Sequence, residues 1–70
     1  MDLEEIYAIK YHENHPIRRK LIAALVENGK TEEEIAIIIP ELLNDIITSG
    51  NAKSLDSDIR AVVRAKIEKV

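Results

Sequence analysis

The chain has 70 residues, of which 46% are apolar and 33% are charged, and its formal net charge is −3. This length supports a single domain, residues 1–70, whose core is aliphatic because the sequence has two tyrosines and no phenylalanine or tryptophan. The absence of cysteine excludes disulfide bonds and cysteine-based zinc sites. The longest apolar run, residues 35–40, is too short for a membrane span, and the acidic start M-D-L-E-E does not fit a secretory signal. We therefore expect a cytoplasmic protein.

Apolar residues recur with the period of a helix along the chain, and no stretch alternates as a strand would. We predict an all-α fold, a small compact bundle of four or five helices. The first helix covers about residues 2–12 and has acidic residues near the positive end of its dipole. One face of this helix carries apolar side chains in helical spacing: Leu3, Ile6, Tyr7 and Tyr11.

The second predicted helix covers about residues 16–28. Pro16 fits its first position, where the missing N–H group costs no hydrogen bond, and Gly29 fits a left-handed C-cap. Besides its main apolar face, this helix has a second apolar stripe formed by Ile22 and Val26. A helix that is apolar on two sides usually lies between neighbours. We expect it at the centre of the bundle, with the second stripe either covered by another helix or placed at a self-association seam.

Thr31 and Glu34 have the spacing of a capping box, which predicts that a third helix begins there and covers about residues 31–49. Pro40 leaves two alternatives: one helix kinked at the proline, or two short helices broken there. Ile39 has no side-chain acceptor with which to cap a new helix. The apolar residues also stay in phase across the proline: Ile35, Ile38, Ile39, Leu42, Leu43 and Ile46. Both observations favour the kinked helix, although a proline inside a helix costs about 3 kcal/mol.

A last helix is predicted over about residues 56–70. Its inward stripe has five members: Ile59, Val62, Val63, Ile67 and Val70. Four charged residues spaced by four predict a ladder of ion pairs along another face: Asp56, Arg60, Arg64 and Glu68.

The segment H-P-I-R-R-K-L-I-A-A-L-V-E-N-G-K-T-E-E-E-I-A, residues 15–36, resembles the start of the reading head in ArsR-type and related helix-turn-helix regulators. The likeness covers about a third of the chain. The resemblance implies DNA binding, with packing roles for residues of two motif helices: Ile35, Ala36, Ile39 and Ile46.

The next segment, P-E-L-L-N-D-I-I-T-S-G, departs from that family. Pro40 stands where the family's turn usually has glycine, and the expected reading helix carries Glu41 and Asp45 without any lysine or arginine. Phosphate and base contacts come mainly from basic and amide side chains, so DNA would repel this helix. A DNA-binding regulator with a degenerate helix-turn-helix is therefore the alternative function, and nucleic acid is the disfavoured partner.

Two charged surfaces are the candidate binding sites. Residues 31–51 contain five acidic residues and no basic one. There the third helix carries an acidic face around one outward isoleucine, a composition typical of protein contacts: Glu33, Ile37, Glu41, Asn44 and Asp45. The second helix begins with a basic patch at its positive dipole end, suited to an anion: Arg18, Arg19 and Lys20.

The favoured function is a non-enzymatic regulatory or interaction module that contacts a protein partner. A second copy of the chain is one expected partner. In the resulting homodimer either the acidic face contacts the basic patch, or Ile22 and Val26 form the seam. There is no thiol and no glycine-rich phosphate loop, so we predict no catalytic residues and no cofactor. His12 and His15 are too few ligands for a metal site, so no metal is expected either.

Overall fold

The structure, a computed structural model, describes residues 3–50, 55 and 57–68. Within these ranges it contains four helices and no strand: α1 (Leu3–Tyr11), α2 (Pro16–Glu27), α3 (Glu32–Ser49) and α5 (Ile59–Glu68). The all-α prediction is therefore confirmed. α5 begins later than predicted because the Asp58 carboxylate accepts the Ala61 N–H at 3.2 Å, which places the cap at residue 58. Asp56 and Val70 lie outside the described residues.

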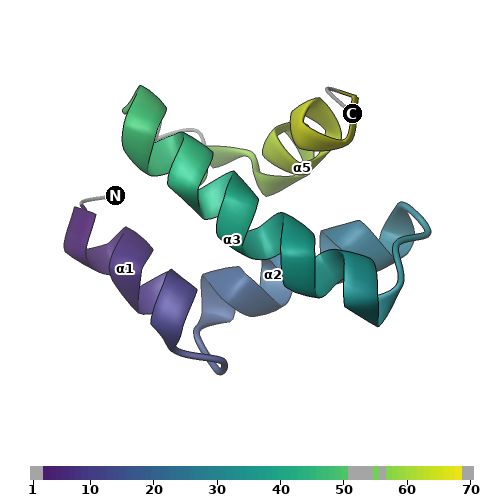
Figure 1. Cartoon of the computed structure of the whole chain (residues 1–70), viewed down its shortest axis with the longest axis horizontal. Coiled ribbons are helices and arrows are strands. Elements are labelled where there is room, and N and C mark those ends of the chain that lie inside the picture. The colour runs from purple at the N-terminus through teal and green to yellow at the C-terminus, as the bar shows by residue number, and fades with distance from the viewer. Residues whose placement is uncertain (1–2, 51–54, 56, 69–70) are drawn as a thin grey trace.

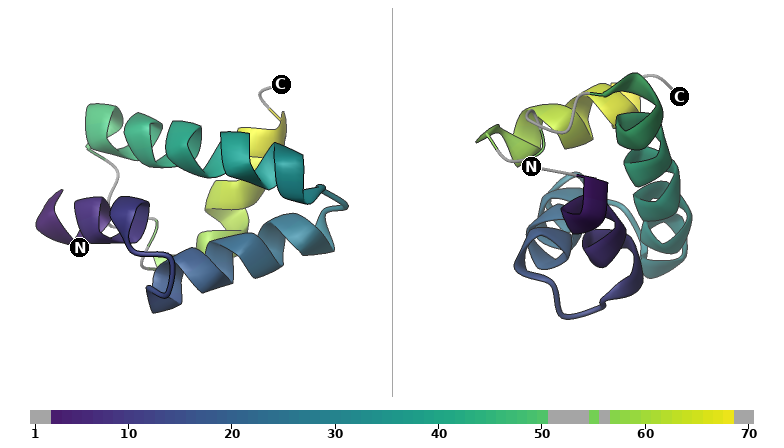
Figure 2. Two further views of the ribbon diagram at one scale, coloured as in Figure 1. Left: turned by 60° about the horizontal axis from the view of Figure 1, so that its bottom comes forward. Right: turned by 90° about the vertical axis from the view of Figure 1, so that its left-hand side faces the viewer.

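The long helix α3 runs diagonally across the molecule, with α1 below its C-terminal half and α2 crossing behind it (Figure 1). α2 contacts each of the other three helices, as expected for the centre of the bundle. α5 crosses the other helices at a steep angle, as the two further views show (Figure 2), and it packs mainly on α2. The resulting body measures 29 × 24 × 18 Å.

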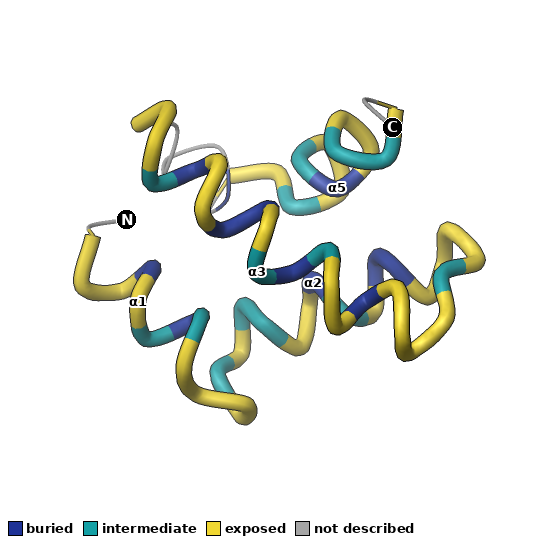
Figure 3. The backbone as a smooth tube through the Cα atoms, in the orientation of Figure 1, coloured by how far each residue is buried: buried dark blue, intermediate teal, exposed yellow. Residues whose placement is uncertain are grey.

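The core is entirely aliphatic, and all four helices contribute to it. Its buried members are Ile6, Ile9, Leu21, Ala24, Leu25, Ile35, Ile39, Leu42, Leu43, Ile46, Leu55 and Val63. Figure 3 shows these buried stretches on the inward sides of the helices. Ile59, Val62 and Ile67 of α5 are half-buried against the same cluster, so the inward stripe predicted for the last helix is confirmed over the described residues.

The apolar face predicted for α1 is buried only at Ile6. Ile6 and Ile9 are buried, whereas Leu3, Tyr7 and Tyr11 are 52%, 41% and 69% exposed. This nine-residue helix carries two apolar stripes, and only one can face the bundle. A buried tyrosine needs a hydrogen-bond partner for its hydroxyl group, and among the described residues no buried polar side chain is present to supply one. The isoleucine stripe is therefore the one that packs inward.

α3 is one helix of 18 residues with Pro40 inside it, so the alternative of two short helices is wrong. The stripe predicted from helical phase is confirmed on both sides of the proline, since Ile35, Ile39 and Leu43 are all buried. The resemblance to helix-turn-helix regulators implied a turn in this region. The helix is continuous there, so that motif is not formed.

The turn between α2 and α3 follows the prediction from the sequence. Gly29 has a φ of 77°, in the left-handed region that glycine adopts without strain. Its N–H donates to the Val26 carbonyl at 3.0 Å, and the Lys30 N–H donates to the Leu25 carbonyl at 3.1 Å. These two bonds form a Schellman motif, which satisfies the carbonyl groups at the end of α2.

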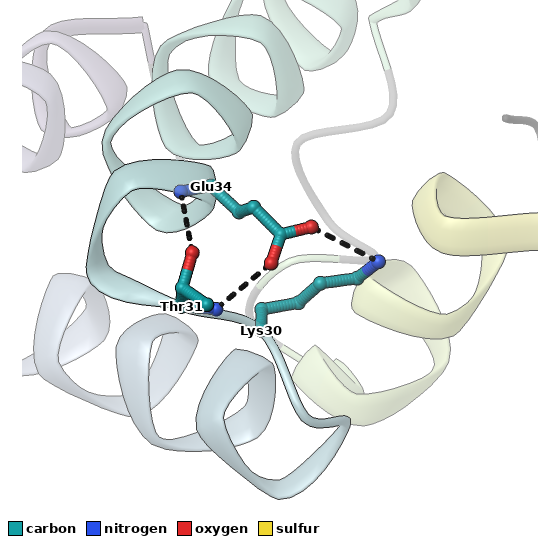
Figure 4. A network of polar contacts seen from close by, with 3 residues as sticks. All are labelled: Lys30, Thr31 and Glu34. Atoms are coloured by element: carbon teal, nitrogen blue, oxygen red, sulfur yellow. Dashed lines mark hydrogen bonds and ion pairs between the residues drawn. The ribbon is translucent and has the colours of Figure 1, made fainter.

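The predicted capping box is present at the start of α3 (Figure 4). The Thr31 hydroxyl accepts the Glu34 N–H at 3.2 Å, and the Glu34 carboxylate accepts the Thr31 N–H at 3.0 Å. Lys30 Nζ lies 3.8 Å from the same carboxylate. The bond from the Thr31 backbone, with smaller contributions from the Thr31 side chain and Lys30, holds the pKa of Glu34 below its ordinary value of 4.5.

The lowered pKa of Glu34 predicts a pH dependence of stability. Its carboxylate stabilises the folded state fully above the unfolded value of 4.5, and this contribution is lost as the pH falls through the lower folded value. We expect Glu34→Gln to be less stable than the unchanged protein near neutral pH. The difference should shrink as the pH falls below about 4.5, measured by urea unfolding. Glu33→Gln, in the same turn but outside the capping box, is the control; an equal shrinkage there would contradict the assignment.

Candidate functional site

The acidic face predicted on α3 is exposed, but other helices engage three of its five residues. Lys66 of α5 places its Nζ 3.5 Å from Glu41 and 3.1 Å from Asp45. The hydrogen bond to Asp45 raises the pKa of Lys66, with further support from Glu41. On the other side, Lys10 of α1 donates to the Asn44 side chain at 3.0 Å. Three of the polar side chains of this face therefore already form ion pairs or hydrogen bonds within the chain.

The remaining two residues of the acidic face are Glu33 and Ile37, which are both exposed. The Ile37 side chain is 62% exposed, as its position on the helix predicted. Ile37 lies on the same side of α3 as Asn44 and two helical turns before it. Asn44 is the residue that accepts the hydrogen bond from Lys10 of α1.

One of the three basic side chains predicted as a patch on α2 is engaged within the chain. Arg18 donates to the backbone carbonyls of Ile9 and Lys10, at 3.3 and 3.1 Å, which makes it a cap for the C-terminal end of α1. Arg19 and Lys20 are exposed. Arg19 and Lys20 therefore remain as the exposed part of the patch, and an anion site formed by all three side chains stays a prediction.

Arg60, a member of the ion-pair ladder predicted on α5, lies 3.4 Å from the Glu27 carboxylate of α2. Its predicted partner Asp56 lies outside the described residues, so the ladder stays a prediction. The Arg60 and Glu27 side chains are both more than half exposed, so this pair contributes little to stability. A pocket of about 230 Å³ lies beside it, between α2 and α5, and includes Lys20 and Ile59 in its lining.

The self-association stripe predicted on α2 is uneven. Ile22 is half-buried and packs against the core, whereas Val26 is 58% exposed. A single exposed valine is ordinary for a protein surface. A seam formed by Ile22 and Val26 stays a prediction.

The two histidines lie at the boundary between α1 and α2. His15 Nδ1 accepts the Ile17 N–H at 3.2 Å and so caps the start of α2. His12 is exposed in the preceding turn. In the part of the chain that the structure describes, no three histidine or acidic side chains come together where a metal ion could be held.

A groove of about 370 Å³ lies between the C-terminal half of α3 and α5. Its lining includes apolar Leu42, Ile46 and Val62 and acidic Asp45 and Asp58. Sequence reasoning did not predict this groove, because it depends on the angle at which α5 crosses α3.

The surface that sequence reasoning also missed is the outer stripe of α1, formed by Leu3, Tyr7 and Tyr11 and called here the α1 face. The two tyrosine rings are stacked, with centroids 6.4 Å apart and planes 8° from parallel. Lys10 Nζ lies 5.6 Å from the centre of the Tyr11 ring. The signal for this surface was the i, i+4, i+8 spacing of three large apolar residues beside a separate isoleucine stripe.

Comparison of the chain with protein-family models, with curated proteins and with solved structures gave no match. None of the helices within the described ranges combines the length and the apolar character that crossing a membrane requires. The function is therefore argued from the surfaces of the molecule.

Proposed function

We propose that the chain is a non-enzymatic interaction module that binds an apolar helix of a partner protein through the α1 face. The observation that supports this most is the exposure of three large apolar side chains in one row, with 41% to 69% of each accessible. Scattered apolar residues are normal on a surface, but a contiguous row with two tyrosines has the composition of an interface centre. Tyrosine is also enriched among residues that dominate binding energy.

The geometry of the α1 face supports the same proposal. Stacking of Tyr7 on Tyr11 holds both rings in one arrangement before any partner binds. α1 itself is tied to α2 by Arg18 and to α3 by the bond from Lys10 to Asn44. A surface that is already ordered loses little conformational entropy on binding, so more of the contact energy appears as affinity.

DNA binding through α2 is the alternative, and the contacts of Arg18 speak against it. This arginine donates to two carbonyls of α1, so Arg19 and Lys20 remain as the exposed basic residues at the start of α2. Non-specific DNA affinity grows with the number of phosphates that basic side chains neutralise. Two adjacent exposed cations give a weak electrostatic contact.

The test uses the immobilised chain, a variant with Tyr7→Ser and Tyr11→Ser, and a control with Arg19→Ser and Lys20→Ser. We expect the unchanged protein and the control to retain a partner that the tyrosine variant does not retain. A second copy of the chain counts as such a partner. The purified partner must reproduce this pattern. Binding that depends on Arg19 and Lys20 alone, or that is found only for labelled duplex DNA at low salt, would overturn the proposal.

A further inference from the structure

The α1 face is symmetric about Tyr7. Leu3 precedes Tyr7 by four residues and Tyr11 follows it by four, so one large apolar side chain lies a helical turn to either side. The charged residues share the symmetry, since acidic Glu4 and basic Lys10 are each three residues from Tyr7. A helix with this pattern complements itself when a second copy lies antiparallel to it.

Resting on the proposed function, we propose that the partner of the α1 face is α1 of a second copy of this chain, in an antiparallel pair with its two-fold axis at Tyr7. In this register Tyr7 meets Tyr7 of the second copy, and Leu3 meets Tyr11 of the second copy. The same patch is used on both molecules, which is the usual closed arrangement of a homodimer. All six apolar side chains then lie in one seam.

Electrostatics favours the antiparallel direction. The first turn of α1 carries Glu4 and Glu5, and Lys10 lies in its last turn. In an antiparallel pair the acidic first turn of each copy is level with the last turn of the other, which carries Lys10 with its bond to Asn44 on the same chain. The two helix dipoles then oppose each other. A parallel pair would bring the acidic first turns of the two copies side by side. Opposite charges at the helix ends therefore select the antiparallel register.

The other self-association surfaces have less support. A dimer that joins the acidic face to the basic patch needs free charges, but Lys66 already pairs with Glu41 and Asp45. Arg18 is likewise engaged with α1. The apolar side chains of the α1 face, in contrast, remain exposed.

The first test is the oligomeric state measured by analytical ultracentrifugation from micromolar concentrations to about 1 mM, a range that detects weak dimers. We expect a monomer–dimer equilibrium that Tyr7→Arg weakens by at least about 30-fold, because this change places two like charges at the axis of the seam. Val26→Arg makes the same kind of change at an exposed position on α2 and should leave the equilibrium unchanged.

The second test uses the absence of cysteine, which makes engineered single cysteines unambiguous. Under mild oxidation we expect Tyr7→Cys to form a disulfide-linked dimer with itself. Leu3→Cys alone should not cross-link, because its two copies lie far beyond the roughly 7 Å between Cα atoms that a disulfide allows. A mixture of Leu3→Cys and Tyr11→Cys chains should cross-link.

The outcomes separate this inference from the proposed function. A chain that is monomeric at every concentration, but still binds another protein through Tyr7 and Tyr11, overturns only the second copy as the partner. A monomer without any tyrosine-dependent binding overturns both. Efficient self-linking of Leu3→Cys, or a dimer that Tyr7→Arg leaves intact, overturns the antiparallel α1 seam.

Discussion

Ile39→Ala is expected to lower the free energy of unfolding by about 3 kcal/mol, within the range for truncating a buried isoleucine. Ile39 is 1% exposed and packs in the core of the bundle. A domain of this length has a total stability of about 4 to 10 kcal/mol, so the loss is a large share of the whole. Urea unfolding followed by far-ultraviolet circular dichroism measures the difference.

Ile37→Ala is the matched control, because it removes the same atoms from the same helix two residues earlier. Ile37 is 62% exposed, so its truncation is expected to change the stability by less than about 0.5 kcal/mol. Any gain in helix propensity is common to both variants and cancels in the comparison. Equal losses from the two changes would contradict the orientation of α3.

Pro40→Ala is expected to stabilise the protein by about 1 to 2 kcal/mol. For a domain of this size each kcal/mol raises the Tm by about 4 to 8 °C. Pro40 lies inside α3 and has no N–H group to donate to the Ala36 carbonyl. Alanine restores that donor and has the highest helix propensity. The gain stays below the full helix-propensity difference of about 3 kcal/mol, because proline also restricts the unfolded chain.

Pro16→Ala is the control for this second change. Pro16 is the first residue of α2, where an N–H group has no partner within the helix. Its replacement is expected to leave the stability unchanged or to lower it slightly, through greater freedom of the unfolded chain. If Pro40→Ala behaved in the same way, Pro40 would mark the boundary between two helices and not the interior of one.

The parts of the fold that local rules determine could be predicted from the sequence. The capping box at Thr31 and the left-handed Gly29 depend on residues within one turn, and both are present. The phase of α3 across Pro40 was also predictable, because that helix has a single dominant apolar stripe. The exposed position of Ile37 followed from the same phase.

The α1 face could not be predicted, because α1 carries two apolar stripes and helical periodicity does not say which one the bundle covers. The bonding partners of long charged side chains could not be predicted either. Arg18, Lys66 and Arg60 all bond to groups on other helices, at sequence separations that no spacing rule connects. These contacts decide which charges remain for a partner, so the candidate site had to come from the structure.

The central claim, that the α1 face is where this chain contacts a second copy of itself, is tested most directly by a dilution series of two-dimensional ¹⁵N–¹H nuclear magnetic resonance spectra. We expect the amide signals of α1 from Leu3 to Tyr11 to shift with concentration. The signals around Val26 and at the exposed start of α3 should stay fixed. Concentration-dependent shifts confined to α2 or to the acidic face of α3, with α1 unchanged, would contradict the claim.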